Sequence, residues 1–188
     1  MEFKGLQNVH DGKFLATYDL YYKTASGNDK TYEMVSRSHD MKTYDDVHNP
    51  TVDSVILIMT DRTGEQILLN REFRMSMGRW IYNFPAGLID PGETPEQSAA
   101  RELREETGLE LLSIDDVLGE SYNAVGFSNE KSVCILGTAG GDFAPSTSDL
   151  EEIEASWFTR SEVRSLLKTE PFAARTQAYC YLWANSEA

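Results

Sequence analysis

The N-terminal half of the chain alternates short apolar runs with polar, turn-forming residues, a pattern typical of β-strands. The runs with strand character are Phe14–Thr24, Lys30–Ser36, Val52–Thr60, Gln66–Arg71 and Arg79–Phe84. Ala25–Asp29 joins the first two runs and contains a glycine, so this pair is expected to form a β-hairpin. The polar stretch Ser38–Pro50 follows, which predicts an N-terminal element over residues 1–49 and a main domain over residues 50–188.

The clearest helix in the chain is predicted at Thr94–Thr107. Thr94 is a favourable N-cap, Pro95 suits the first helical position, and Gln97 completes a capping box. Gly108 is expected to end the helix, because glycine adopts the left-handed conformation of a C-cap at little cost. The apolar face of this helix consists of Ala99, Ala100 and Leu103.

The C-terminal part of the chain is expected to add strands and then helices. The runs with strand character are Leu109–Ser113, Asp116–Tyr122, Ser132–Thr138 and Ile153–Phe158, and the helical runs are Ser161–Leu167 and Phe172–Ala184. Strands, one helix, more strands and two final helices predict a mixed α/β domain built in layers.

The composition narrows the classes of partner. The chain has 17 Lys and Arg against 31 Asp and Glu, a formal net charge of −14, which argues against a nucleic-acid partner because such binding depends on basic residues. The longest apolar stretch, near Val55–Met59, is too short to cross a bilayer, and Met1–Asp11 has no apolar signal segment. The short apolar stretch predicts no membrane partner. Cys134 and Cys180 lie in separate apolar runs, which favours buried free thiols and a cytoplasmic protein.

Three carboxylates crowd one turn of the predicted helix. Glu102, Glu105 and Glu106 repel one another at neutral pH, and Glu102 and Glu106 share a face. Mg²⁺ prefers carboxylate oxygens and typically combines one or two of them with substrate phosphates, so the cluster fits a metal site that Glu93 is placed to join. The alternative is an ordinary solvated helix face. Arg101 lies four positions before Glu105 and is expected to brace that carboxylate.

The spacing of these residues resembles a known signature. The segment from Gly87 matches G-x5-E-x7-R-E-U-x-E-E-x-G-U, the Nudix box, in which U is a bulky aliphatic residue. The matching positions are Gly87, Glu93, Arg101, Glu102, Leu103, Glu105, Glu106, Gly108 and Leu109. The predicted elements around the box are also similar to the Nudix α/β/α sandwich with its mixed sheet, so the resemblance extends from Val52 to the C-terminus.

This resemblance implies an enzyme that uses Mg²⁺ or Mn²⁺ to hydrolyse a nucleoside diphosphate linked to another group. The metal ligands that the motif implies are Glu102, Glu106, Glu105 and the backbone carbonyl of Ala86. Glu93 and Arg101 correspond to positioning residues in this motif. Glu93 is expected to help bind the substrate, and Arg101 and Glu105 are expected to assist catalysis.

The segment before the box narrows the resemblance. Residues 71–74 (Arg-Glu-Phe-Arg), Trp80 and Phe84–Glu93 are similar to ADP-ribose and nucleoside-diphosphate-sugar pyrophosphatases. In that group an N-terminal β-hairpin element commonly helps to form a homodimer, and Phe14–Ser36 resembles it. Arg74 is then expected either to contact a phosphate or ribose of the substrate or to lie at the surface or dimer interface.

A second motif of this group departs from its usual form. The group typically has S-P-G-x-x-x-E after the box, and residues 124–130 here have the sequence Ala-Val-Gly-Phe-Ser-Asn-Glu. Gly126 and Glu130 match and are expected to bind substrate. Val125 replaces the usual proline, which weakens the case for ADP-ribose itself without affecting the metal chemistry.

The general base in this group is often a glutamate on a loop well after the box. Residues 149–154, Asp-Leu-Glu-Glu-Ile-Glu, resemble that loop, and Glu151 is the first choice and Glu152 the second. The alternative is a solvated acidic loop. Tryptophan side chains pack in the core more often than they stack on a nucleobase, and this is the expectation for Trp80, Trp157 and Trp183. The three histidines, His10, His39 and His48, lack the spacing of metal ligands and are expected at the surface.

Three functions are compatible with these patterns. The first is a pyrophosphatase for ADP-ribose or a related nucleotide sugar. The second is a Nudix hydrolase of another small nucleotide, such as a dinucleoside polyphosphate, NADH or an oxidised nucleotide. The third is a nucleotide-sensing Nudix module without hydrolysis, but such modules usually lose the box glutamates, and all of them are present here.

Overall fold

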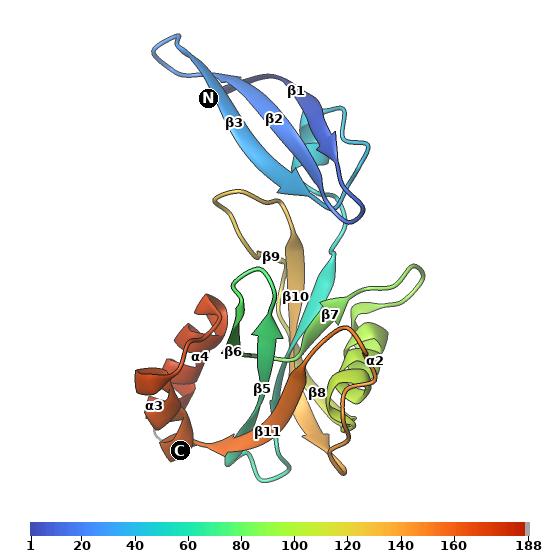
Figure 1. Cartoon of the computed structure of the whole chain (residues 1–188), viewed down its shortest axis with the longest axis vertical. Coiled ribbons are helices and arrows are strands. Elements are labelled where there is room, and N and C mark those ends of the chain that lie inside the picture. The colour runs from blue at the N-terminus through green and yellow to red at the C-terminus, as the bar shows by residue number, and fades with distance from the viewer. Residues whose placement is uncertain (187–188) are drawn as a thin grey trace. The chain divides into compact units, whose positions relative to one another are not determined.

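The computed structural model describes residues 1–186, which form two compact units (Figure 1). The first unit consists of Met1–Asp53 and Glu120–Ser132, and the second of Ser54–Gly119 and residues 133–186. The first unit thus includes residues 120–132, which the sequence pattern assigns to the main domain. This segment bonds to the N-terminal strands, since Val35 N donates to Phe127 O at 2.8 Å, and a contact so distant along the chain leaves no periodic signal.

The first unit is a three-stranded antiparallel sheet and not the predicted two-stranded hairpin. Its strands are β1 (Glu2–Asp11), β2 (Ala16–Lys23) and β3 (Asp29–Ser36), with β2 in the centre. β1 was missed because it is an edge strand whose polar side chains are mostly exposed. A short helix, α1 (Tyr44–Val47), interrupts the predicted polar stretch. The core of this unit consists of Ala16, Tyr18, Leu20, Met34 and Met41.

The second unit is built on a sheet with strand order β11-β5-β4-β10-β8, in which β6 pairs with β5 and β7 with β4. The strands are β4 (Ser54–Thr60), β5 (Gln66–Arg74), β6 (Arg79–Asn83), β7 (Ala86–Leu88), β8 (Glu110–Val117), β9 (Ser121–Tyr122), β10 (Lys131–Gly140) and β11 (Ile153–Thr159). β9 pairs with the first two residues of β10, which belong to the first unit. In β4 every residue except Thr60 is buried, as expected of a central strand covered on both faces.

Helices cover both faces of this sheet (Figure 1). α2 (Pro95–Thr107) lies on one face, and α3 (Arg160–Thr169) and α4 (Ala174–Asn185) lie on the other. The core beneath α3 and α4 consists of Ile56, Ile58, Ile67, Leu69, Phe84, Val163, Cys180 and Ala184. Because side chains alternate along a strand, Leu68, Asn70 and Glu72 of β5 point to the opposite face, where α2 lies.

The predicted α/β sandwich is confirmed, and α2, α3 and α4 lie where helices were expected. Within the second unit, the strand prediction missed β7 and divided β8 wrongly. The predicted strands Leu109–Ser113 and Asp116–Tyr122 are in fact one strand, β8, followed by the short β9. The strand continues through Asp115 and Asp116 because β8 is an edge strand with mostly exposed side chains, where these charges stay in solvent. The pairing register of β8 with β10 shifts at two places, as at a β-bulge, and the strand continues past both shifts.

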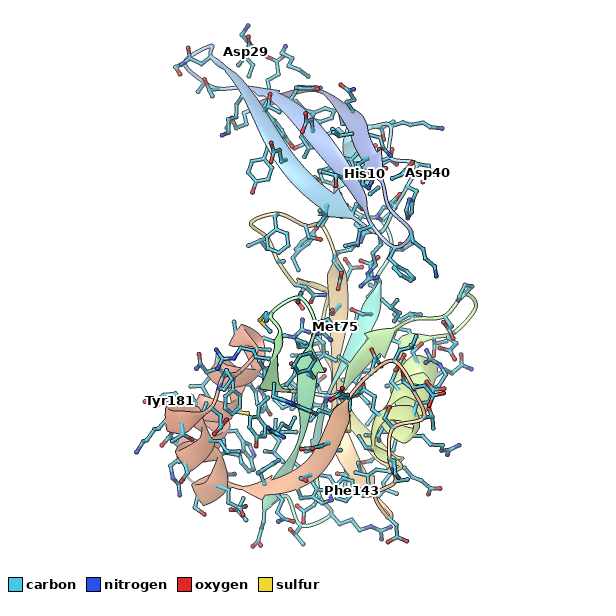
Figure 2. The ribbon with its side chains drawn as sticks, viewed as in Figure 1. His10, Asp29, Asp40, Met75, Phe143 and Tyr181 are labelled. Carbon is cyan, nitrogen blue, oxygen red and sulfur yellow. The ribbon has the colours of Figure 1, made fainter. Side chains whose placement is uncertain are left out.

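Several predictions about single residues are also borne out. His10, His39 and His48 are exposed, and Figure 2 shows His10 on the sheet of the first unit. Cys134 and Cys180 are free thiols as predicted, but only Cys180 is buried, and Cys134 is partly exposed. Burial raises the pKa of Cys180 to about 12.

No helix formed by residues 1–186 has both the length and the apolar character needed to cross a membrane.

Candidate active site

Helix α2 begins and ends at defined residues, which fixes the direction of its acidic side chains. Thr94 Oγ1 accepts from Gln97 N at 3.3 Å and Gln97 Oε1 accepts from Thr94 N at 2.9 Å, so the predicted capping box is confirmed. Gly108 ends the helix with a φ of 79°, a conformation that favours glycine. These local signals place Glu106 on the face of α2 that meets the sheet.

Glu106 is the most deeply buried carboxylate of the helix, at 8% exposure. Its Oε2 accepts a hydrogen bond from Asn70 Nδ2 at 2.8 Å and another from the backbone N of Ala86 at 3.3 Å. Burial raises the pKa of Glu106 well above its ordinary value, and the negative charges of Glu102 and Glu72 add to the effect. Both hydrogen-bond donors are neutral, so they leave the charge of the ionised carboxylate uncompensated.

Glu102 lies against the glycine that opens the box. A side chain at Gly87 would overlap the Glu102 carboxylate, so only glycine lets the chain and this carboxylate approach so closely. The Glu102 side chain is 13% exposed, and burial raises its pKa even though Arg101 donates to Oε1 at 2.7 Å. Gly87 thus has a steric role that the motif match alone does not explain.

Arg101 joins the loop before α2 to the helix itself. Its guanidinium bonds both oxygens of Glu93, at 2.9–3.2 Å, and donates to the Leu88 carbonyl at 2.9 Å. It also donates to Glu105 Oε2 at 3.3 Å, so the predicted brace is present. Hydrogen bonds from Arg101, and then from Ser98, lower the pKa of Glu93 to about 2. Arg101 and Glu93 therefore form an internally neutralised pair that supports the loop.

Glu72 is an acidic residue of the site that the sequence reasoning did not assign. It is 7% exposed on the α2 face of β5, and Asn83 Nδ2 donates to its Oε1 at 2.9 Å. Burial raises the pKa of Glu72, against the opposing effect of Arg74, whose guanidinium lies 3.6 Å from Oε2. The two-residue alternation of Asn70 and Glu72 in β5 was the available signal, because it places both side chains on one face.

The acidic loop before β11 is anchored beside these carboxylates. The backbone N of Phe73 donates to the Glu152 carbonyl at 3.0 Å, next to the pairing of β11 with β5. Burial is the largest cause of the raised pKa values of Glu72, Glu102 and Glu106, and the charge of Glu151 adds to each of them. The exposed Glu151 side chain is therefore within electrostatic reach of the cluster, whereas Glu152 accepts the hydrogen bond from Phe73 through its backbone carbonyl.

The donor set fits a divalent cation. Glu102 and Glu106 are two largely buried carboxylates of like charge, and a cation between such groups would relieve their repulsion. Within residues 1–186, no three acidic, histidine or cysteine side chains converge to complete a ligand set by themselves. Mg²⁺ does not need such a set, because it typically takes one or two carboxylates and completes its shell with water and substrate phosphates.

The remaining predicted site residues are placed as follows. Arg74 is about half exposed in the second unit, beside Glu72. Gly126 and Glu130 belong to the first unit, where the Gly126 carbonyl accepts from Tyr32 Oη. Glu130 accepts from Arg37 Nε at 3.1 Å and from Asn123 Nδ2 at 2.8 Å, so its carboxylate has structural partners.

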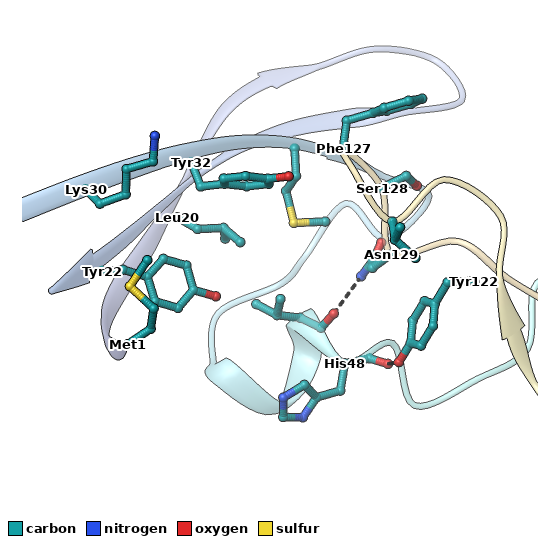
Figure 3. A pocket seen from close by; sticks show the side chains of 13 residues that line it. Met1, Leu20, Tyr22, Lys30, Tyr32, His48, Tyr122, Phe127, Ser128 and Asn129 are labelled. Atoms are coloured by element: carbon teal, nitrogen blue, oxygen red, sulfur yellow. Dashed lines mark hydrogen bonds between the residues drawn. The ribbon is translucent and has the colours of Figure 1, made fainter. Parts of the chain in front are cut away.

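The aromatic residues contact other side chains of the chain. Trp80 lies edge-on to Phe73, with Arg71 over its ring at 4.5 Å, and Trp157 lies 6.2 Å from Phe143. These contacts agree with packing roles. The first unit also contains a mostly apolar cavity of about 620 Å³ (Figure 3), lined in part by Tyr22, Tyr32, Tyr122, Val125 and Phe127.

The second unit is thus an α/β sandwich that carries an acidic helix against a glycine-containing loop. The NUDIX domain family model matches residues 50–180, and the chain belongs to the Nudix family. A solved structure described as an ADP compounds hydrolase superposes with a TM-score of 0.72 at 18% identity, covering 97% of this chain and 92% of the other. This likeness confirms the predicted Nudix fold.

Two curated relatives bear on the subfamily. An ADP-ribose pyrophosphatase of Mycobacterium tuberculosis is 35% identical over 121 residues, which is 62% of this chain and 58% of that protein. An ADP-sugar pyrophosphatase of Mus musculus is 32% identical over 100 residues, which is 53% of this chain and 44% of that protein. The chain spans about half the length of the curated relatives it matches.

Proposed function

We propose that this chain is a metal-dependent hydrolase that splits the pyrophosphate bond of ADP-ribose or a related nucleoside-diphosphate sugar. The products are a nucleoside monophosphate and a sugar phosphate. The observation that carries the proposal is the approach of Glu102 and Glu106, two largely buried like charges, beside a glycine loop with a complete Nudix box. Membership of the Nudix family supports the reaction class, and the names of the relatives support the substrate class.

Mg²⁺ or Mn²⁺ is the proposed cofactor. Glu102, Glu106 and the Ala86 carbonyl would hold it, and the more exposed Glu105 would contribute through solvent or directly. When bound, the metal would screen the phosphates and stabilise the charge that develops on their oxygens. The chain supplies a dry, acidic face for this purpose, since Glu106 is almost fully buried.

Glu151 is proposed as the general base, with Glu152 as the second candidate. The oxygen of a water molecule bonds to one phosphorus while the bridging P–O bond breaks, and the departing phosphate keeps the bridging oxygen. The proton of that water passes to the Glu151 carboxylate. The exposed position of Glu151 beside the cluster supports this role, because the group must reach both solvent and a phosphate held there.

Other residues are proposed to position the substrate. Arg74 is the cation beside the cluster, and its half-exposed guanidinium suits a phosphate or ribose oxygen. Arg101 and Glu93 would hold the loop that faces the substrate. The substrate roles of Gly126 and Glu130 rest on the resemblance of residues 124–130 to the family motif.

A second candidate function is hydrolysis of another small nucleotide. It is favoured by Val125, which stands where ADP-ribose pyrophosphatases usually have proline. The non-catalytic sensing module is the weakest candidate, because no box glutamate is lost.

A substrate panel tests these assignments. The purified chain is incubated with ADP-ribose, ADP-glucose, UDP-glucose, NADH and Ap4A, first with Mg²⁺ and then with Mn²⁺, and nucleoside monophosphate release is measured. We expect metal-dependent release with a preference for ADP-ribose or ADP-glucose. Preference for Ap4A or NADH would move the assignment to the second candidate. No turnover on any compound would refute the proposed activity and favour the sensing module.

The first unit is proposed to take part in a homodimer. Its apolar, aromatic cavity, whose lining includes the exposed Val125 and Phe127, offers the kind of surface that a second copy covers. Sedimentation velocity of the full chain over a range of concentrations tests this, with a mass twice that of one chain as the expected result.

The two free thiols support a reducing compartment, and we propose the cytoplasm.

A further inference from the structure

Strand β5 holds a polar residue at a position where packing alone would favour an aliphatic one. Asn70 is 1% exposed and lies on the same face as the fully buried Leu68. Asparagine is depleted in strands, and a buried amide lowers stability unless both of its ends are hydrogen-bonded. Asn70 Oδ1 has no hydrogen-bond partner among residues 1–186. The fold therefore retains Asn70 although its side-chain oxygen has no hydrogen-bond partner in the described part of the chain.

The other end of this amide contacts the acidic helix. Asn70 Nδ2 donates to Glu106 Oε2 at 2.8 Å, and the Ala86 backbone N donates to the same oxygen at 3.3 Å. These two donors come from different strands, β5 and β7, so together they restrict the rotation of the carboxylate. Neither donor engages Oε1.

The Asn70 amide that donates to Glu106 carries no charge, and this distinguishes it from a cationic donor. Arg101 shows what a cation does in this unit: it donates three charge-assisted hydrogen bonds to Glu93 and neutralises it. A cation at position 70 would neutralise Glu106 in the same way and would compete with a metal ion for it. An amide orients the carboxylate and leaves its charge available.

We propose that Asn70 is a positioning residue for a divalent cation on Glu106, holding the carboxylate through Oε2. The inference rests on the proposed function, since it assumes that Glu106 is a metal ligand. Hydrogen bonds to a metal-binding carboxylate typically fix its orientation, and their loss weakens metal binding about 10- to 100-fold. A purely structural role predicts a different result, in which Asn70 affects stability and leaves metal affinity unchanged.

Metal binding by the apo protein separates these roles. The full chain and its N70L variant are titrated with Mn²⁺ alone, without nucleotide, and free Mn²⁺ is measured by electron paramagnetic resonance. Leucine has the same number and branching of side-chain heavy atoms and removes both the donor and the unsatisfied Oδ1. The Ala86 backbone N still donates to Glu106 Oε2 in this variant, so the metal-free variant is expected to fold. We expect Mn²⁺ affinity to fall about 10- to 100-fold.

Thr107→Val provides the matched control. Thr107 is buried beside Glu106 in sequence, but its hydroxyl bonds the Leu103 carbonyl and the Leu109 N and does not touch the carboxylate. T107V is expected to lower the unfolding temperature and to keep wild-type Mn²⁺ affinity. If N70L fails to fold, N70V repeats the test with a better strand former.

The outcomes distinguish the inference from the function on which it rests. Failure of the wild type to bind Mn²⁺ would refute the metal site and the proposed function with it. Wild-type binding with equal affinity in N70L would overturn the positioning role alone. An equal loss of affinity in T107V would also overturn it, because affinity would then follow general stability and not the Asn70 amide.

Discussion

At the scale of single residues, charge balance divides the acids of the second unit into two kinds. Glu93 is neutralised by Arg101, and its pKa falls to about 2. Glu106 is in the opposite situation, because burial first and the charges of Glu102 and Glu72 next raise its pKa. Glu93, the neutralised acid, anchors a loop. Glu106, the acid with a raised pKa, is the proposed ligand of a cation.

The anchoring role of Glu93 predicts a pH-dependent stability difference between wild type and E93Q. The folded-state pKa of Glu93 lies below its ordinary value of 4.5, at about 2. Its contribution is therefore fully present above about pH 4.5 and is lost as the pH falls toward 2. Urea unfolding should show wild type as the more stable protein at pH 7, with a difference that shrinks below pH 4.5. A difference that is the same at pH 7 and pH 3 would contradict this role.

The steric role of Gly87 predicts a specific loss of activity in G87A. The added methyl group would displace the Glu102 carboxylate, and a misplacement of about 1 Å at an active site lowers turnover about 100-fold. Gly119→Ala is the matched control, because a side chain there meets no neighbouring atom within 4 Å. Steady-state turnover of both variants tests the prediction. Equal activity in G87A and G119A would show that Glu102 needs no such space.

The assignment of the base predicts unequal effects of two neighbouring substitutions. Loss of a general base lowers kcat about 10²- to 10⁴-fold, so E151Q should show a loss in that range. E152Q should stay near wild type, because the contact that anchors Glu152 is made by its backbone. The pH profiles of kcat for the two variants provide the measurement. A large loss in E152Q with normal activity in E151Q would transfer the role to Glu152.

At the scale of elements, helix α2 was predictable and its partner strand was only partly so. Thr94, Gln97 and Gly108 are local signals, and each is found in the expected cap. β5 was expected over Gln66–Arg71 but extends to Arg74. Alternation along β5 indicates which residues share a face, but it does not indicate which helix that face meets. The contact of Asn70 with Glu106 joins residues 36 positions apart, and no periodicity encodes it.

The capping box of α2 predicts a measurable contribution to stability. Thr94→Ala removes the oxygen that accepts from Gln97 N and should lower the free energy of unfolding by about 0.5–2 kcal/mol. Thr94→Ser keeps that oxygen and should retain most of the stability. Urea denaturation of both variants provides the measurement. Equal stability of T94A and T94S would show that the cap contributes nothing.

At the scale of the whole molecule, the sequence predicted the main domain better than the N-terminal unit. The fold of residues 54–119 and 133–186 was predictable from the Nudix box and the order of the strands, because both can be recognised along the sequence. The polar strand β1 and the inclusion of residues 120–132 in the first unit were not predictable. One is an edge strand without alternation, and the other depends on contacts made far along the chain.

The central claim is that ADP-ribose or a related nucleotide sugar is hydrolysed through a metal held by the acidic helix. The most direct test is release of nucleoside monophosphate from ADP-ribose by wild type and E106Q, each with Mg²⁺ and with EDTA. Metal contributes several kcal/mol to such reactions, and ~1.4 kcal/mol is a factor of ten in rate. We expect wild-type turnover only with Mg²⁺, and E106Q folded but slower by at least about 100-fold. Undiminished turnover in EDTA, or near-normal activity in E106Q, would contradict the account.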